Sequence, residues 1–127
     1  DYIPEHLLTR EFLEEVKDRL APGGVVVANT FSSSRLYHHE SATYEAAFTH
    51  VAELKLPITL NRILVAAEGA WPDAERLRAR AEALQPRLRR YGIDTAPLAR
   101  NLDRDFAYDE DARLLTDQYA PANLLSQ

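Results

Sequence analysis

The chain has 127 residues, of which 46% are hydrophobic, and its 15 basic and 20 acidic side chains give a net charge of −5. This length suits one modest domain or part of a larger one. The acidic balance disfavours nucleic-acid binding, which needs Lys and Arg to displace counterions. Because there is no Cys, disulfides, zinc–thiolate sites and thiol nucleophiles are excluded. No apolar run approaches the roughly 18 residues of a membrane span, so no membrane partner is expected.

The sequence pattern predicts a first helix that begins near Arg10, with Thr9 as its N-cap. Its apolar residues recur every four positions: Phe12, Val16 and Leu20. A Pro-Gly-Gly turn at 22–24 ends the helix. The β-branched run at 25–30 has no polar alternation, which predicts a strand buried on both faces. A helix, a tight turn and a buried strand in this order indicate a parallel α/β sheet.

A second helix is predicted from Glu40 to His50, and its inner side would carry three residues: Tyr44, Ala47 and Phe48. Two strands follow, at 51–56 and 62–67, separated by Pro57 and a turn. Because these strands are close in sequence, an antiparallel pair is expected.

The remainder of the chain has a different pattern. Pro72 suits the first turn of a helix whose apolar face repeats along the segment. The residues of that face are Leu77, Ala81, Leu84 and Leu88. Pro86 should kink or divide this helix, and Gly92 should close it. A short helix is predicted within 93–101, and mostly irregular chain from Leu102 onward.

The order of these elements resembles the last third of a class I methyltransferase fold. The sequence of the segment IPEHLLTREFLEEVKDRLAPGGVVVANTF resembles that of the polyamine aminopropyltransferases, the spermidine-synthase-like family. In that family a catalytic-loop proline precedes a helix carrying a phenylalanine, a Pro-Gly turn and the fifth sheet strand. Here these features are Pro4, Phe12, 22–24 and 25–29. ATYEAAFTHVAELKLPITLNRILVA looks like the next helix and the terminal hairpin, and LLTDQYAPANLL resembles the family's tail.

The resemblance implies the fold class: α/β, the C-terminal part of a Rossmann-like methyltransferase fold, with one parallel-type strand, an antiparallel terminal hairpin, and helices. Residues 1–69 would complete the transferase domain, and residues 70–127 would form a helical and irregular extension.

The same resemblance implies that the parent protein transfers an aminopropyl group from decarboxylated S-adenosylmethionine to a polyamine such as putrescine. The amine attacks a carbon next to a sulfonium, so the protein must align the reactants and accept a proton. The resemblance also implies a cytoplasmic enzyme that forms a homo-oligomer, commonly a dimer.

Several of the family's functional motifs have no counterpart in this sequence. The Gly-rich cofactor loop and the acidic residue that holds the cofactor ribose belong to earlier strands of the fold. We therefore expect a fragment that binds neither decarboxylated S-adenosylmethionine nor S-adenosylmethionine and is inactive in isolation. The catalytic residue stays unassigned. Asp1 lies near the family's catalytic aspartate position, at the end of the same loop, and is a candidate for it.

Four residues are predicted to bind substrate. Asn29 and Thr30 end the predicted parallel strand, and ligands bind at this edge of open α/β sheets; a loop-capping role is the alternative. Pro4 belongs to the family's catalytic loop. Asn61 would line the same pocket or simply stabilise its turn. The family carries a diamine-contacting Tyr before its last strand, whereas residues 57–61 contain none, so the acceptor is left open.

Two further features of the sequence bear on metal binding. No metal site is predicted, because the adjacent His38 and His39 point apart on most backbones and no third ligand has clear spacing. The acidic tract at 103–111 lacks the spacing of a calcium loop. Two alternative functions remain open: a methyltransferase acting on a non-polyamine substrate, and a non-catalytic dimerisation or binding domain.

Overall fold

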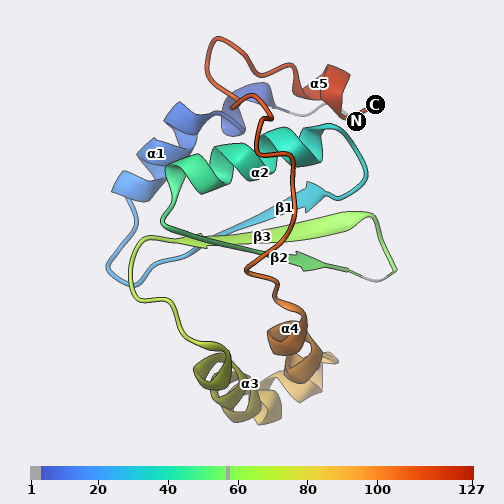
Figure 1. Cartoon of the computed structure of the whole chain (residues 1–127). Helices are drawn as coiled ribbons and strands as arrows, with labels where there is room; N and C mark the ends of the chain where they lie inside the picture. The colour runs from blue at the N-terminus through green and yellow to red at the C-terminus, as the bar shows by residue number, and fades with distance from the viewer. Residues whose placement is uncertain (1–3, 57) are drawn as a thin grey trace.

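The computed structural model describes residues 4–56 and 58–127. Three strands, β1 (Val26–Phe31), β2 (His50–Lys55) and β3 (Asn61–Ala67), form one sheet in the order β1-β3-β2. Both neighbouring pairs are antiparallel, so β1 and β2 run in the same direction on either side of β3 (Figure 1). The predicted α/β fold and its terminal hairpin of β2 and β3 are confirmed.

Two helices, α1 (Arg10–Asp18) and α2 (Leu36–Ala47), cover one face of the sheet, and the short helix η1 (Glu5–Leu7) precedes them (Figure 1). The predicted cap of α1 is present, since the Phe12 amide donates to the Thr9 hydroxyl at 3.2 Å. The core lies between these helices and the inner face of the sheet. Its buried members are Leu13, Tyr44, Ala47, Phe48, Val51, Leu64, Ala66 and Phe106.

The α2 helix begins four residues before the predicted Glu40 and ends at Ala47 rather than His50. No side chain caps its first turn. Instead Leu36 is buried in a second cluster with residues from the end of the chain, namely Leu115, Ala122 and Leu125. Burial against a distant segment therefore sets this helix start, and local sequence signals do not report such burial.

The prediction that β1 is buried on both faces is wrong for this chain. Burial alternates along the strand: Thr30 is 6% exposed, whereas Val27 is 62% exposed. The inner face packs on the α1 and α2 side. The outer face is open, and of the two helices on that side the shorter one contacts β2.

Those outer helices are α3 (Ala74–Leu88) and α4 (Thr95–Asn101), joined by η2 (Arg89–Tyr91). Pro72 lies before the N-cap Asp73 rather than in the first turn, because the Asp73 carboxylate caps the Arg76 amide at 2.8 Å. Pro86 does not divide α3, which continues to Leu88. Gly92 closes the segment with φ of 73°, a left-handed conformation that glycine adopts without steric cost.

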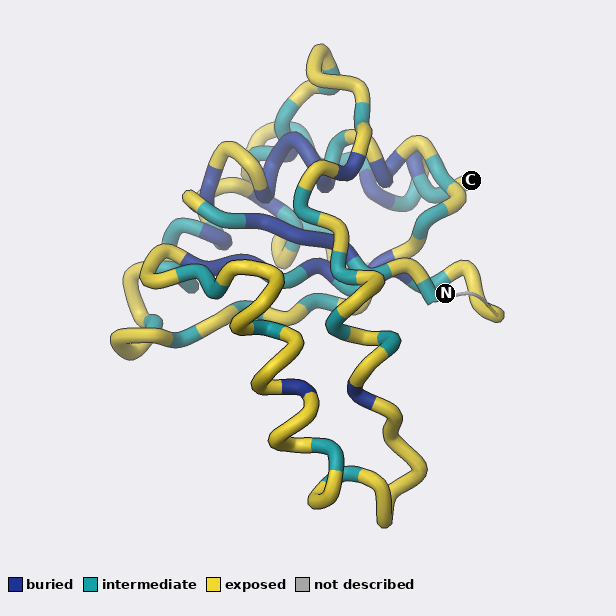
Figure 2. The backbone as a smooth tube through the Cα atoms, turned by 60° about the horizontal axis from the view of Figure 1, so that its bottom comes forward, coloured by how far each residue is buried: buried dark blue, intermediate teal, exposed yellow. Residues whose placement is uncertain are grey.

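The end of the chain returns over α2 and finishes in α5 (Ala122–Leu125), close to the N-terminal segment (Figure 1). The Leu115 amide donates to the Thr43 hydroxyl at 2.9 Å, and the Asn123 side chain donates to Glu5 at 3.1 Å. The tail of the predicted extension thus packs against the predicted transferase segment, while α3 and α4 project away from it (Figure 2).

Candidate functional site

Asn29 and Asn61, here called the amide pair, lie on the open outer face of the sheet. Asn29 is opposite Ile63 in the ladder, and Asn61 is two residues away on the same face. The Asn61 Nδ2 donates to the Asn29 Oδ1 at 3.2 Å. Among the described residues, no partner engages the Asn29 Nδ2 or the Asn61 Oδ1. The pair therefore presents a donor and an acceptor near the carboxyl end of β1, where binding was predicted.

Thr30 lies on the opposite, inner face of the same strand because successive side chains of a strand alternate. Its hydroxyl accepts a hydrogen bond from the Arg62 Nε at 2.9 Å and lies 3.3 Å from the Arg62 carbonyl oxygen. The structure therefore separates Thr30 from Asn29 and places it behind the amide pair rather than beside it.

The other two predicted residues belong to the N-terminal segment. Pro4 is exposed and directly precedes η1. Its neighbour Glu5 contacts Asn123, so this segment lies beside α5. The candidate base Asp1 lies outside the described residues. Its catalytic role, like the binding roles of Pro4, Asn29, Thr30 and Asn61, stays a prediction.

Arg62 organises a buried polar cluster that sequence reasoning missed. The side chain is fully buried. Its Nη2 lies 3.1 Å from Glu40, and its Nη1 lies 2.7 Å from the Ser41 hydroxyl and 3.6 Å from Glu53. The guanidinium also lies 4.1 Å from the centre of the Tyr37 ring. The Arg62 cluster is defined by these residues: Thr30, Tyr37, Glu40, Ser41, Glu53 and Arg62.

The sequence did contain a signal for this cluster. Residues 62, 64 and 66 share the inner face of β3, and the latter two, Leu64 and Ala66, are fully buried. An arginine in register with such residues must be buried with them, and a buried charge needs partners. The alternating pattern around Arg62 therefore pointed to buried acidic partners.

Burial shifts the acid–base behaviour of the Arg62 cluster. It raises the pKa of Glu40 to about 7, with Arg62 acting in the opposite direction. Burial also raises the pKa of Tyr37, and the nearby Glu53 carboxylate adds to the effect. A hydrogen bond to Glu53 raises the pKa of Lys55, whose Nζ lies 3.0 Å from that carboxylate.

The Arg62 cluster is the support behind the amide pair. It joins β1 through Thr30, β2 through Glu53, and α2 through Glu40. Thr30 and Arg62 are the sequence neighbours of Asn29 and Asn61. Because the backbone positions of the two strands are fixed from behind, the amides on the front face are held in a defined spacing.

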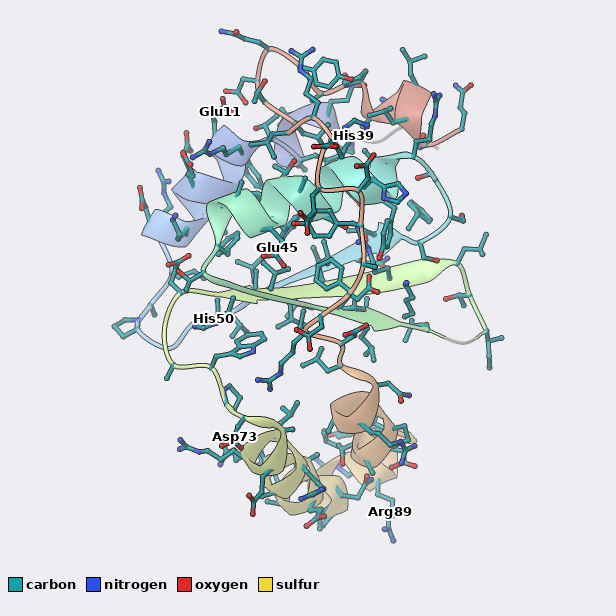
Figure 3. All side chains as sticks on the ribbon, viewed as in Figure 1. Glu11, His39, Glu45, His50, Asp73 and Arg89 are labelled. Carbon is teal, nitrogen blue, oxygen red and sulfur yellow. The ribbon has the colours of Figure 1, made fainter. Side chains whose placement is uncertain are left out.

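The two adjacent histidines hold the C-terminal segment. His38 Nδ1 accepts from the Asp109 amide at 3.1 Å, and His39 Nδ1 donates to the Arg113 carbonyl oxygen at 2.7 Å. Figure 3 labels His39 on α2. Within residues 4–56 and 58–127, no group of three or more His, Asp or Glu side chains is arranged to hold a metal ion. In the same part of the chain, no helix has the length and apolarity needed to cross a membrane.

Comparison with known proteins found one close sequence relative and one structural neighbour. No protein-family profile matches the chain. A polyamine aminopropyltransferase from Vibrio vulnificus (strain CMCP6) is 46% identical over 126 residues, which is 98% of this chain and 42% of that protein. The crystal structure of a probable spermidine synthase from Corynebacterium glutamicum ATCC 13032 matches 90% of this chain and 46% of its own, with a TM-score of 0.54 and 24% identity.

The structural match shows that this chain has a methyltransferase-like fold. The chain spans less than half the length of each of these two proteins. The resemblance that the sequence motifs indicated is therefore confirmed, and the chain is homologous to part of a polyamine aminopropyltransferase.

Proposed function

We propose that the full-length protein transfers an aminopropyl group from decarboxylated S-adenosylmethionine to a polyamine in the cytoplasm, and that this chain forms its C-terminal part. The observation that carries the proposal is the 46% identity to a polyamine aminopropyltransferase across 98% of the chain. The cofactor site is assigned to the remainder of the protein. The proton-accepting carboxylate is unassigned, with Asp1, next to the Pro4 loop, as the candidate.

In this proposal the amide pair lies at the edge of the acceptor site. The Asn61 Oδ1 accepts a hydrogen bond from an ammonium group of the polyamine substrate. The Asn29 Nδ2 donates a hydrogen bond to a neighbouring acceptor atom. Holding the amine in line with the carbon next to the sulfonium is the main requirement, since the leaving group is already activated. The Arg62 cluster serves this requirement by fixing the strands that carry the amides.

A methyltransferase with a non-polyamine substrate is the second candidate. The observation that favours it is the sequence at 57–61, which lacks the tyrosine expected of authentic spermidine synthases. Asn29 likewise stands where those enzymes carry glutamine. Both changes affect the acceptor side of the site.

The two functions are separated by the mass of the product. The full-length protein is incubated with decarboxylated S-adenosylmethionine and putrescine, or with S-adenosylmethionine and a small-molecule extract freed of polyamines, and products are identified by mass spectrometry. Aminopropylated putrescine supports the proposal, whereas a methylated non-polyamine compound supports the second candidate. If neither product forms while the protein still binds a partner, the non-catalytic alternative is favoured.

Kinetics of variants test the role of the amide pair. Asn61→Ala in the full-length protein should raise KM for the amine about tenfold, in line with loss of a hydrogen bond to a charged group, with a smaller effect on kcat. Asn101→Ala, an exposed asparagine at the end of α4, is the matched control. Equal KM values for both variants would show that the amide pair does not bind the amine.

A further inference from the structure

The projecting pair of helices, α3 and α4, carries a charge opposite to that of the whole chain. Residues 72–104 contain eight arginines against five acidic residues, although the chain as a whole has a net charge of −5. The charges are not matched locally: within the described residues, none of the arginines of this segment forms an ion pair with a carboxylate. The segment is therefore a basic surface on an acidic protein.

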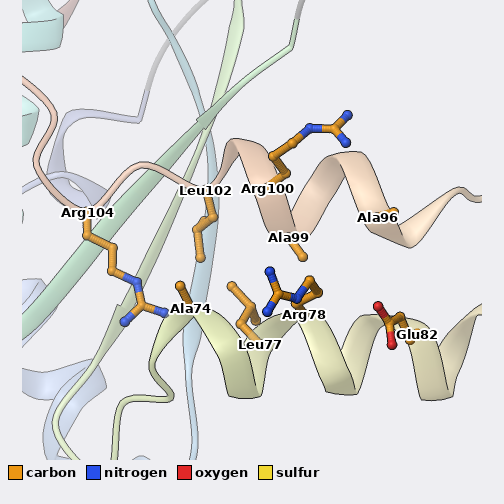
Figure 4. Close-up of a pocket in the computed structure, with 9 residues that line it drawn as sticks. All are labelled: Ala74, Leu77, Arg78, Glu82, Ala96, Ala99, Arg100, Leu102 and Arg104. Carbon is orange, nitrogen blue, oxygen red and sulfur yellow. The ribbon is translucent and has the colours of Figure 1, made fainter.

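A pocket of about 370 Å³ lies between α3 and α4 (Figure 4). Its apolar lining comes from five aliphatic side chains: Ala74, Leu77, Ala96, Ala99 and Leu102. Its charged lining residues are Arg78, Glu82, Arg100 and Arg104. A concave site of this size with an apolar floor and few polar groups is typical of small-molecule binding.

Two guanidinium groups face one part of this pocket. Figure 4 shows those of Arg78 and Arg104 on either side of Ala74 and Leu77, whereas the guanidinium of Arg100 points away from α3. The Arg104 Nη2 is buried and has no hydrogen-bond partner among the described residues. The same guanidinium lies 5.2 Å from the centre of the Trp71 ring, which fixes its position.

The Arg104 side chain lines the pocket and, within the described residues, forms no ion pair, so it can bind an anionic group there. Arginine forks match planar carboxylates, with two parallel N–H···O bonds. The aliphatic floor at Leu77 and Ala99 suits a short hydrocarbon body. Glu82, which lines the pocket away from Arg104 (Figure 4), disfavours a second negative charge on the ligand.

We propose that the pocket between α3 and α4 binds a small monocarboxylate with an apolar body. The carboxylate lies between Arg78 and Arg104, and the hydrocarbon part packs on Ala74, Leu77 and Ala99. This site is on the outer helices and is separate from the amide pair, so it does not depend on the proposed transferase function.

Binding is tested on the full 127-residue chain with hexanoate as the probe, by calorimetry and by NMR amide shifts. Hexanol and hexylamine are the matched probes that lack the carboxylate, and sulfate tests for an anion alone. Hexanoate should bind saturably and shift the amides of Ala74, Leu77 and Ala99, with hexanol at least tenfold weaker. Equal binding of hexanoate and hexanol, equal shifts by sulfate (an adventitious ion only), or no saturable binding would each overturn the proposal.

Variants assign the binding to the two arginines. Arg78→Gln should weaken hexanoate at least tenfold, and Ala99→Leu should abolish binding by filling the pocket without removing a charge. Glu82→Gln should strengthen the binding of hexanoate. Arg80→Gln, which removes an exposed arginine of α3 that does not line the pocket, is the control and should leave affinity unchanged. Because Arg78 is exposed and Ala99 is half-buried, these variants do not depend on the packing of Arg104. Unchanged affinity for hexanoate in both Arg78→Gln and Ala99→Leu would contradict the proposal.

Discussion

At the scale of single residues, Arg62 carries the largest predicted effect on stability. Arg62→Met keeps much of the side-chain volume but leaves Glu40 buried without its counter-charge and Glu53 with Lys55 alone. Removing one partner of a buried ion pair costs roughly 3–5 kcal/mol, and we expect a loss of this size in the free energy of unfolding, measured by urea denaturation. Arg76→Met, on the exposed surface of α3, should change it by no more than about 0.5 kcal/mol.

A further variant separates the loss of charge compensation from the loss of packing. Adding Glu40→Gln and Glu53→Gln to Arg62→Met removes the uncompensated charges and should recover part of the stability, because a neutral cluster no longer needs the guanidinium. If the triple variant is less stable than Arg62→Met, the contribution of Arg62 lies in its packing and hydrogen bonds rather than in charge compensation.

Glu40 should make stability depend on pH. Its folded-state pKa is raised from 4.5 to about 7, so the folded protein holds this proton more tightly than the unfolded chain does. The associated stability is fully present below pH 4.5 and is lost as the pH rises towards 7. Glu40→Gln mimics the protonated form. The unfolding free energy of the natural chain should therefore fall relative to this variant by roughly 3 kcal/mol across that window.

The comparison with Glu40→Gln isolates this one group, because the other titrating residues are shared by both proteins. Arg62 and Tyr44, which interact with the Glu40 carboxylate in the natural chain, are present in both proteins. Urea denaturation at several pH values measures the difference. A difference in unfolding free energy that is flat between pH 4.5 and 7 would show that Arg62 keeps Glu40 ionised throughout.

Residue-scale features were predictable from sequence where local rules fix them. Asn29 and Asn61 were both named, and the structure joins them. Thr30 was grouped with Asn29 because they are adjacent in sequence, but strand alternation sends their side chains to opposite faces. The Arg62 cluster was missed because its acidic partners come from α2 and β2, and no local spacing in the sequence shows which distant groups meet.

At the scale of elements, the N-terminus of α1 was predictable because its cap is local. Thr9 is nearly fully buried and accepts the Phe12 amide at 3.2 Å. Thr9→Ala should cost about 1 kcal/mol of unfolding free energy, the usual value of a lost N-cap. Thr9→Ser retains the capping hydroxyl and should recover most of this loss in the same denaturation experiment. Equal losses in the two variants would assign the effect to the missing methyl group instead.

The elements that departed from prediction did so for tertiary reasons. The α2 helix starts at Leu36 because that side chain is buried with Leu115 and Leu125. Strand β1 has the β-branched composition of a strand covered on both faces, yet one face is open in this chain. Composition reports what a strand is suited to pack against, whereas exposure depends on which other segments are present.

At the scale of the whole molecule, the open face and free edge of β1 are the features with the clearest consequence. Val25, Val27 and Phe31 are 53%, 62% and 46% exposed. Among the described residues, β1 pairs with β3 alone, so its other edge has unpaired backbone groups. Exposed apolar side chains beside an unpaired strand edge favour association with another sheet.

We therefore expect the 127-residue chain to self-associate through β1, measured by sedimentation equilibrium. Val27→Lys places a charge on the open face, where the exposed position tolerates it, and should raise the dissociation constant at least about tenfold, which is about 1.4 kcal/mol. Leu124→Lys changes an equally exposed apolar residue on α5 and is the control.

A natural chain that stays monomeric over the measured concentrations, or an equal effect of the two lysines, would contradict association through β1. Retention of self-association by Val27→Lys in the full-length protein, with loss in the isolated chain, would show that β1 is covered within the complete fold and that oligomers form through another surface.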